Sequence, residues 1–544
     1  MSLWQTKDQL TDLLCSLVEY PSITNSNEEI AIIEYLYYIL EDRDYYKKRP
    51  EQLNLHPLDD GRQLLTALVK KDEAKETLVL LAHVDVVGVD DYGSYQNLAF
   101  YPRDLTQELQ KNIQDLPKEA ARDLKTGNWL FGRGTMDMKA GLTVHLSLLE
   151  KAMAGEFDGN LLLVAVPDEE VNSEGMLAAL PALAEIKEKQ NLTFKGALNG
   201  EPMFSKYPGD SAYYLYTGSI GKTLPGFLCY GKETHAGEPF GGLNANLMVS
   251  YLAQEMELNE AFIEKVGGER TPPPLSLMLR DLKHEYSVQT PQAAVAMYNV
   301  LYMKQTIQEL NEKLLLAAQR AKAKIINHYH HQASFYLEGT QTSAFHPDIT
   351  ILSYEQLYKE AVDRYGKKEV ERRQNRLVNL RDQGDRDFST TLVQSLASLC
   401  KDISPMIVLF YSPPFYPSVS SHNDPFIKHG AKVAMDYAKE NFDEELEVVE
   451  YFTGLSDLSF IGPSSTASSL SDLTKQMPIH GNGFEWPAEV MESITMPIIN
   501  IGPLGRDPHQ WTERLELSYS FEKLPQILTR TIHELFKTER SSTV

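Results

Sequence analysis

The sequence has little of several features that would mark particular classes of protein. Its only three cysteines, Cys15, Cys229 and Cys400, lie far apart, which argues against a disulfide scaffold or a cysteine metal site and fits a reducing compartment. No apolar run reaches the length of a membrane span, and Lys7 and Asp8 interrupt the first apolar positions, so we expect neither a membrane anchor nor a signal peptide. These absences predict a cytoplasmic protein.

Positive charge is also scarce. The chain has 52 Lys and Arg against 76 Asp and Glu, a formal net charge of −24, which would repel nucleic acid and anionic lipid. We therefore exclude nucleic acid and membrane as main partners. With 544 residues the chain is too long for a single core, so we expect two or more domains.

A buried strand is predicted at 77–87, and it carries polar residues near its end. The apolar residues from Leu78 to Ala82 precede His83 and Asp85. Two residues apart on a strand, these side chains would share a face, so Asp85 could support a metal-binding His83. Taken alone, the pair is more often a core histidine bonded to a backbone carbonyl.

Acidic residues follow the next predicted elements. Asp137 lies in a glycine-rich loop before a helix at 142–152, where it could bridge two cations or, equally, cap the helix. A strand at 160–166 ends in Asp168, Glu169 and Glu170, at the carboxyl end where open α/β sheets bind ligands. A solvated loop is the alternative for these three acids.

Two further positions complete a set of candidate metal ligands. Glu201 follows a strand at 194–199, and His509 follows a strand near 498. The set contains two imidazoles and three carboxylates, which suit two borderline divalent ions such as zinc. Three carboxylates leave one positive charge on two such ions, which a bridging hydroxide would cancel. Glu169, beside a ligand but not one itself, is then available as a general base. The five ligands are His83, Asp137, Glu170, Glu201 and His509.

Together these motifs resemble the dinuclear-zinc metallopeptidase family that includes glutamate carboxypeptidase, succinyl-diaminopimelate desuccinylase, aminoacylase and peptidase T. The resemblance implies that His83 and Glu201 bind one zinc ion, Glu170 and His509 bind the other, and Asp137 bridges them; cobalt or manganese could replace zinc. It also implies that Glu169 is the proton shuttle and that Asp85 supports His83. The matching stretches are His83–Asp85, Gly132–Lys139, Asp168–Glu170, Gly200–Pro202, and Gly502–Pro503 with His509 and Glu513.

The resemblance also implies the fold class and domains. We expect an α/β catalytic domain at 1–211 and 424–544, with a mixed, mostly parallel sheet covered by helices. A βαββαβ lid and dimerisation domain would be inserted at 212–423, with an extra helical segment at about 345–402. Within the lid we predict strands near 282–289 and 293–303 and a helix from Thr306 to about His328.

Three more site residues come from the resemblance. The family's counterpart of His235 stabilises the oxyanion in a partner subunit's site, which implies a homodimer; without the family, His235 is more simply a surface loop residue. The counterpart of Asn244 contacts substrate, and the loop around Asp457 resembles the family's Gly-Thr-Asp-Ala loop near the substrate. The arginine that many relatives use to grip a substrate carboxylate is missing from Met297–Tyr302.

The predicted function is hydrolysis of an amide bond in a small peptide or N-acyl amino acid, by a metal-bridged hydroxide with Glu169 as general base. The long lid and the ending around His509 look most like the arginine-utilisation, RocB-type branch, which implies a role in arginine catabolism. Two alternatives stay open. One is hydrolysis of a carbamoyl or amidine-like C–N bond, and the other is a non-catalytic protein that binds a metabolite.

Overall fold

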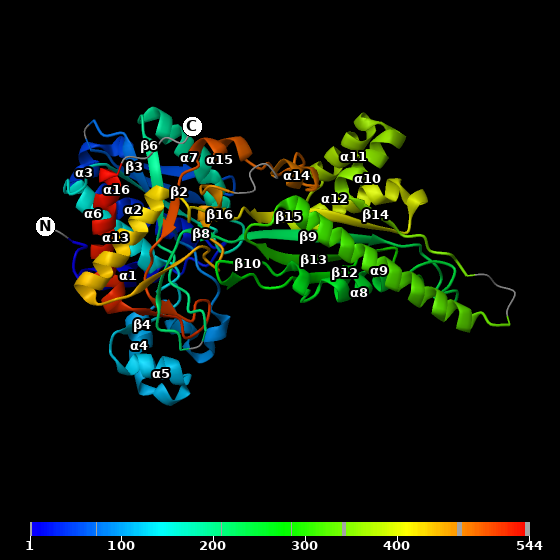
Figure 1. The fold of residues 1–544 in the computed structure, drawn as a ribbon, viewed down its shortest axis with the longest axis horizontal. Helices are drawn as coiled ribbons and strands as arrows, with labels where there is room; N and C mark the ends of the chain where they lie inside the picture. Colours follow the sequence, from blue (N-terminus) through cyan, green and yellow to red (C-terminus); the bar gives the residue numbers. More distant parts are fainter. Residues whose placement is uncertain are drawn as a thin grey trace. The chain divides into compact units, whose positions relative to one another are not determined.

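The computed structural model describes residues 3–71, 73–207, 209–283, 285–339, 344–464 and 470–538. The chain forms two compact units (Figure 1). The first unit comprises Met1–Ile220, Val419–Ser464 and Pro487–Val544, and the second comprises Gly221–Ser418 and Ser465–Trp486, each over its described residues. None of the helices in these ranges combines the length and apolarity that a bilayer crossing requires.

An eight-stranded sheet forms the centre of the first unit, in the order β1-β2-β5-β3-β6-β18-β7-β17. The neighbours β5, β3, β6 and β18 run parallel, whereas β1 and β2 join one edge antiparallel. The strands are β1 (Leu53–Pro57), β2 (Gln63–Val69), β3 (Glu76–His83), β5 (Asn160–Val166), β6 (Thr193–Asn199), β7 (Tyr213–Tyr216), β17 (Leu446–Val449) and β18 (Ile498–Asn500).

The central strands β3 and β5 are buried because most of their residues are apolar, as a sheet covered on both faces requires. One hydrophobic core joins them to residues of α1, α2, α6, α13 and α16, helices that come from both ends of the chain. The helices of this unit are α1 (Lys7–Val18), α2 (Glu28–Glu41), α3 (Asp44–Lys48), α4 (Pro102–Lys111), α5 (Lys118–Lys125), α6 (Lys139–Met153), α7 (Glu174–Lys189), α13 (Pro425–Phe442), α15 (Ala488–Ile494) and α16 (Leu524–Lys537).

The parallel strands of this sheet end at one edge. β3 ends at His83, β5 at Val166 and β6 at Asn199, so the residues that follow each strand meet there. A small sheet, formed by β4 (Trp129–Phe131), β19 (Gly505–Arg506) and β20 (Arg514–Glu516), joins the loop after β4 to the C-terminal segment. Segments from distant parts of the sequence are thereby brought to one place.

The second unit contains a five-stranded sheet in the order β12-β13-β9-β15-β14, antiparallel except for the pair β14 and β15. On one face, Leu228, Val408 and Phe410 pack with α10 and α12 in a common core. On the other face, the Tyr411 hydroxyl donates to Asn311 Oδ1 of α9. The strands are β9 (Gly221–Tyr230), β12 (Leu275–Asp281), β13 (Ala293–Tyr302), β14 (Thr350–Ser353) and β15 (Met406–Tyr416). The helices are α8 (Ala245–Met256), α9 (Ile307–Tyr336), α10 (Tyr354–Tyr365), α11 (Lys367–Asn379), α12 (Asp385–Leu399) and α14 (Leu470–Lys475).

Two predicted elements of the lid are corrected. The strand predicted near 282–289 is wrong, because the edge strand β12 is Leu275–Asp281 and the described residues after it form irregular chain and bends, with an isolated bridge at Gln289. Leu275, Leu277 and Leu279 alternate along β12 but point to solvent, so their pattern did not mark a core strand. The helix predicted to end near His328 continues to Tyr336.

The boundaries of the units also differ from the predicted domains. Strand β7 (Tyr213–Tyr216) belongs to the eight-stranded sheet, so the second unit begins later than residue 212. The prediction assigned every residue after 423 to the catalytic domain, but the described part of Ser465–Trp486 groups with the second unit. Gln476 explains this grouping, since its carbonyl accepts from Tyr411 N and its side chain exchanges hydrogen bonds with Glu355.

Candidate metal centre

His83 presents one unpaired ring nitrogen to two carboxylates. Its Nδ1 lies 3.0 Å from the carbonyl oxygen of Asp85, and because that oxygen can only accept, Nδ1 carries a proton, so that in the neutral ring Nε2 carries the lone pair. Nε2 is buried without a hydrogen-bond partner, 3.4 Å from Asp137 Oδ1 and 3.6 Å from Glu201 Oε1. A buried imidazole lone pair that faces two carboxylates fits a divalent cation.

A second imidazole approaches the other side of Asp137. His509 Nε2 lies 3.4 Å from Asp137 Oδ2 and 3.0 Å from Glu170 Oε1. Unlike His83, the His509 side chain is 49% exposed, and its backbone has a positive φ of 62°. His509 therefore lies at the solvent side of this group, whereas the side chains of Asp137 and Glu170 are each 8% exposed.

The two groups share one carboxylate. Asp137 directs Oδ1 to His83 and Oδ2 to His509, so it lies between two candidate cation positions. This is the arrangement that the resemblance implies for a bridging ligand, and the mixture of imidazole nitrogens and carboxylate oxygens fits two divalent ions. The described residues contain three groups whose ligand atoms lie within 4.8 Å of one another: His83, Asp137 and Glu201; Asp137, Glu170 and His509; and His83, Glu169 and Glu170.

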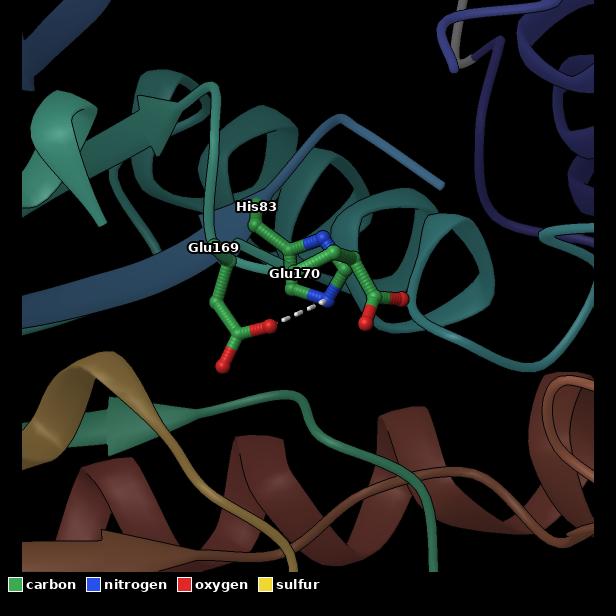
Figure 2. A group of neighbouring side chains, drawn as sticks. All are labelled: His83, Glu169 and Glu170. Atoms are coloured by element: carbon green, nitrogen blue, oxygen red, sulfur yellow. Dashed lines mark ion pairs between the residues drawn. The ribbon is translucent and has the colours of Figure 1, made fainter. Parts of the chain in front are cut away.

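Glu169 faces the same centre but belongs to neither of the two groups that share Asp137. Its Oε2 lies 3.9 Å from His83 Nε2, and the carboxylates of Glu169 and Glu170 lie on either side of the His83 ring in Figure 2. Burial raises the pKa of Glu169 well above its ordinary value, and the nearby carboxylates of Glu201 and Glu170 raise it further, against the effect of His83. Buried carboxylates this close together repel one another, and bound cations would neutralise that repulsion.

Asp85 supports both His83 and the loop after β5 that carries Asp168, Glu169 and Glu170, called here the acidic loop. Strand β3 ends at His83, so Asp85 lies beyond the strand. The prediction that His83 and Asp85 share one face of a strand is therefore wrong. Its Oδ1 accepts from Glu169 N at 3.0 Å and lies 3.4 Å from His83 Nδ1, while Oδ2 accepts from Glu170 N at 3.2 Å and from the Thr24 hydroxyl at 2.8 Å. One carboxylate thus holds the backbone of the acidic loop beside the ring of His83.

A buried ion pair holds the loop that carries Asp137. Glu513 Oε1 accepts from the backbone N–H groups of Met136 and Asp137, at 3.3 and 3.5 Å, and Oε2 accepts from Arg133 Nη1 at 2.6 Å. The side chains of Arg133 and Glu513 are 1% and 0% exposed. Both residues lie in stretches that match the family, but the sequence alone indicates no role for either of them. The signal that could have indicated a supporting role is the position of Arg133 between two glycines, in the stretch that carries Asp137.

The three remaining predicted residues lie in different surroundings. Asp457 is buried in the first unit, and its charge raises the pKa of both Glu169 and Glu201, so it belongs to the same electrostatic cluster. His235 and Asn244 lie in the second unit. His235 Nδ1 accepts from Gly237 N in an exposed turn, and Asn244 caps α8 by accepting from Asn246 N.

The fold and this site define a metal-dependent hydrolase of the α/β class. A family model described as peptidase family M20/M25/M40 matches residues 106–482, which is more than half of the chain. The chain belongs to this family.

Two curated relatives cover almost its whole length. YqjN of Bacillus subtilis (strain 168), described as an uncharacterized protein, is 49% identical over 540 residues, which are 99% of this chain and 98% of YqjN. Protein RocB of the same organism is 28% identical over 553 residues, which are 98% of this chain and 96% of RocB. Among solved structures, the di-peptidase Dug1p of Saccharomyces cerevisiae has a TM-score of 0.51 at 10% identity, covering 98% of this chain and 96% of its own, which supports the fold alone.

Proposed function

We propose that this protein hydrolyses an amide bond in a small peptide or N-acyl amino acid with the help of two divalent metal ions. The observation that carries the proposal is that two groups of ligand atoms share Asp137, with Glu169 beside them. His83, Asp137 and Glu201 would hold one ion, and Asp137, Glu170 and His509 would hold the other. Zinc is the metal we propose, since imidazole and carboxylate suit it well.

The chain's own groups account for the handling of the proton. When bound, the two ions would polarise the scissile carbonyl and make a water molecule more acidic. Glu169 Oε2 takes the proton of the attacking water and delivers it to the leaving nitrogen. Asp85 keeps Glu169 in place through the backbone N–H of that residue. Glu513, through Asp137 N, keeps the shared ligand between the two positions.

We further propose that the substrate belongs to amino-acid catabolism, and to arginine breakdown in particular. The support is the resemblance to the RocB-type branch together with 28% identity to RocB over nearly the full length. Measuring turnover of zinc- or cobalt-loaded protein against dipeptides, N-acyl amino acids and their arginine derivatives tests this. Cleavage of dipeptides without preference for arginine would contradict the arginine proposal and leave the amide hydrolase proposal intact.

The decisive test of the mechanism compares two adjacent glutamates. Glu169→Ala should keep two metal ions per chain and lose about 10²–10⁴-fold in kcat, the usual contribution of a general base. Glu170→Ala should lose metal as well as activity, because it removes a ligand. Metal content by mass spectrometry and turnover on the same samples give both readouts. Parental turnover by Glu169→Ala would rule out the assigned base.

We also propose a homodimer formed through the second unit, on the resemblance that gives His235 a role in a partner's site. The exposed turn around His235 leaves this side chain accessible. Sedimentation of the metal-loaded protein should give twice the chain mass of 61.5 kDa. A fully active monomer would contradict the proposal.

A further inference from the structure

A second ion-pair cluster lies behind the acidic loop, and the metal centre uses none of its members. Its centre is Arg62, which is 5% exposed and directly precedes β2. The guanidinium is in contact with four carboxylates. Nη1 lies 3.2 Å from Glu29 Oε2 and 3.1 Å from Asp168 Oδ1, Nη2 donates to Glu174 Oε2 at 2.7 Å, and Nε donates to Asp60 Oδ2 at 2.6 Å.

Two of these carboxylates hold the backbone at the start of the acidic loop. Glu29 Oε1 accepts from Asp168 N at 2.9 Å, and Asp168 Oδ2 accepts from Glu174 N, also at 2.9 Å. The carbonyl of Asp168 accepts from Ser173 N at 2.7 Å and closes the loop. Asp168 itself has a φ of +70°, a conformation that a residue other than glycine keeps only where its surroundings enforce it.

The charge balance makes Arg62 indispensable to this arrangement. Glu29 and Asp168 are both completely buried, and one guanidinium serves them both. A buried carboxylate is costly unless a cation pairs with it, and Arg62 Nη1 lies 3.2 Å from Glu29 Oε2 and 3.1 Å from Asp168 Oδ1. Without the cation, two buried carboxylates would lie next to a centre already crowded with acids, and the loop would have to rearrange.

We propose that Arg62 is a positioning residue for Glu169. Through Glu29 and Asp168 it fixes the first residue of the loop, while Asp85 fixes the two residues that follow. Glu169 is joined to Asp168 by one peptide bond, so the direction of its carboxylate depends on both anchors. The inference rests on the proposed function, because it assumes that Glu169 is the base.

Arg62→Lys is the primary test, because lysine keeps the charge but cannot contact four carboxylates in a planar fork. We expect kcat to fall about 10- to 100-fold from misplacement of the base, with KM within about threefold of the parent. The metal content should stay at two ions per chain. Loss of a metal ion would overturn the proposal, because the cluster would then act on Glu170 and not on Glu169.

A double-mutant cycle separates positioning from a general loss of structure. In a chain that already carries Glu169→Ala, adding Arg62→Lys should change the residual rate by less than about twofold, because the group that Arg62 positions is gone. A full 10-fold further loss in that background would overturn the proposal. Parental kcat in Arg62→Lys alone would overturn it as well.

The chain offers a matched control and a second variant. Arg43 lies in the same unit, is 17% exposed, pairs with Glu150 and covers the ring of Trp4. Arg43→Lys should leave kcat unchanged. If Arg62→Lys does not give folded protein, Glu29→Gln serves in its place, since its amide oxygen can still accept from Asp168 N while the charge is lost. It should lower kcat at constant metal content, and parental kcat would count against the proposal.

The outcome for this inference can be told apart from that for the proposed function. Absence of amide turnover by the metal-loaded parent means that the proposed function has failed, and parental turnover by Glu169→Ala means that the assigned base is wrong. An impaired Glu169→Ala beside a fully active Arg62→Lys means that only the positioning role has failed.

Discussion

The two halves of the candidate metal centre, one around His83 and one around His509, differ in how firmly the protein holds their side chains. The half around His83 is buried, and its ring is fixed by Asp85 at the end of a central strand. The half around His509 lies on a loop, and that side chain is 49% exposed. Rigid supports preorganise a site, whereas exposed loops open at low cost. Two ions bound side by side in this site would therefore be held with unequal strength.

The largest effect should come from removing either histidine. His83→Ala and His509→Ala should each keep one ion per chain and lose on the order of 10³-fold or more in kcat, since either change removes half of the metal chemistry. Denaturant unfolding of the metal-free proteins separates them. His83→Ala should lose about 1–3 kcal/mol, because the Asp85 carbonyl loses its buried donor, and His509→Ala less than about 0.5 kcal/mol. Equal losses of stability would contradict the comparison.

The next largest effect should come from Arg133, which pairs with Glu513 and so supports the loop that carries Asp137. Arg133→Met leaves Glu513 buried without its cation, so we expect a loss of about 3–5 kcal/mol in the free energy of unfolding. Both ions should bind more weakly, because Asp137 belongs to both halves. Urea unfolding and metal titration of the same variant measure this. Weaker binding at only one of the two positions would show that the Asp137 loop does not support both halves.

Graded removal of metal tests whether the two candidate ion positions differ in affinity. As chelator is added, the ion held by Glu170 and His509 should leave first, with an affinity about 10-fold lower than that of its neighbour, the usual size of a supporting-contact effect. Counting the ions retained at each chelator concentration gives two steps for unequal sites. A single step with loss of both ions together would mean that the exposure of His509 does not matter for affinity.

The smallest effect is expected at Asn244, which lies outside the candidate metal centre. Asn244 caps α8 in the second unit, so Asn244→Ala should cost about 1 kcal/mol of unfolding free energy. The metal content should stay at two ions per chain. Thermal unfolding checks the stability. A kcat that falls together with the cap would support the substrate contact that the resemblance implies for Asn244, and an unchanged kcat would count against it.

Much of the fold could be predicted because its signals are local. The strands β3 and β5 appear in the sequence as apolar runs, and the acids and histidines at and after the strand ends mark the edge where ligands bind. The supports could not be predicted in this way. Arg62 and Glu29 are distant in sequence from Asp168, and nothing near any of them shows that they meet. The edge strand β12 escaped prediction because its leucines face solvent.

The return of the chain to its first unit has a consequence for biosynthesis. The eight-stranded sheet takes β18 from the last quarter of the sequence, and His509 follows that strand. During synthesis the residues of the second unit and most of the first unit's core are therefore made before the last candidate metal ligand. A divalent ion bound at that stage would lack part of its ligand set, so we expect full metal loading only after synthesis has passed His509 and the returning strand has joined the sheet.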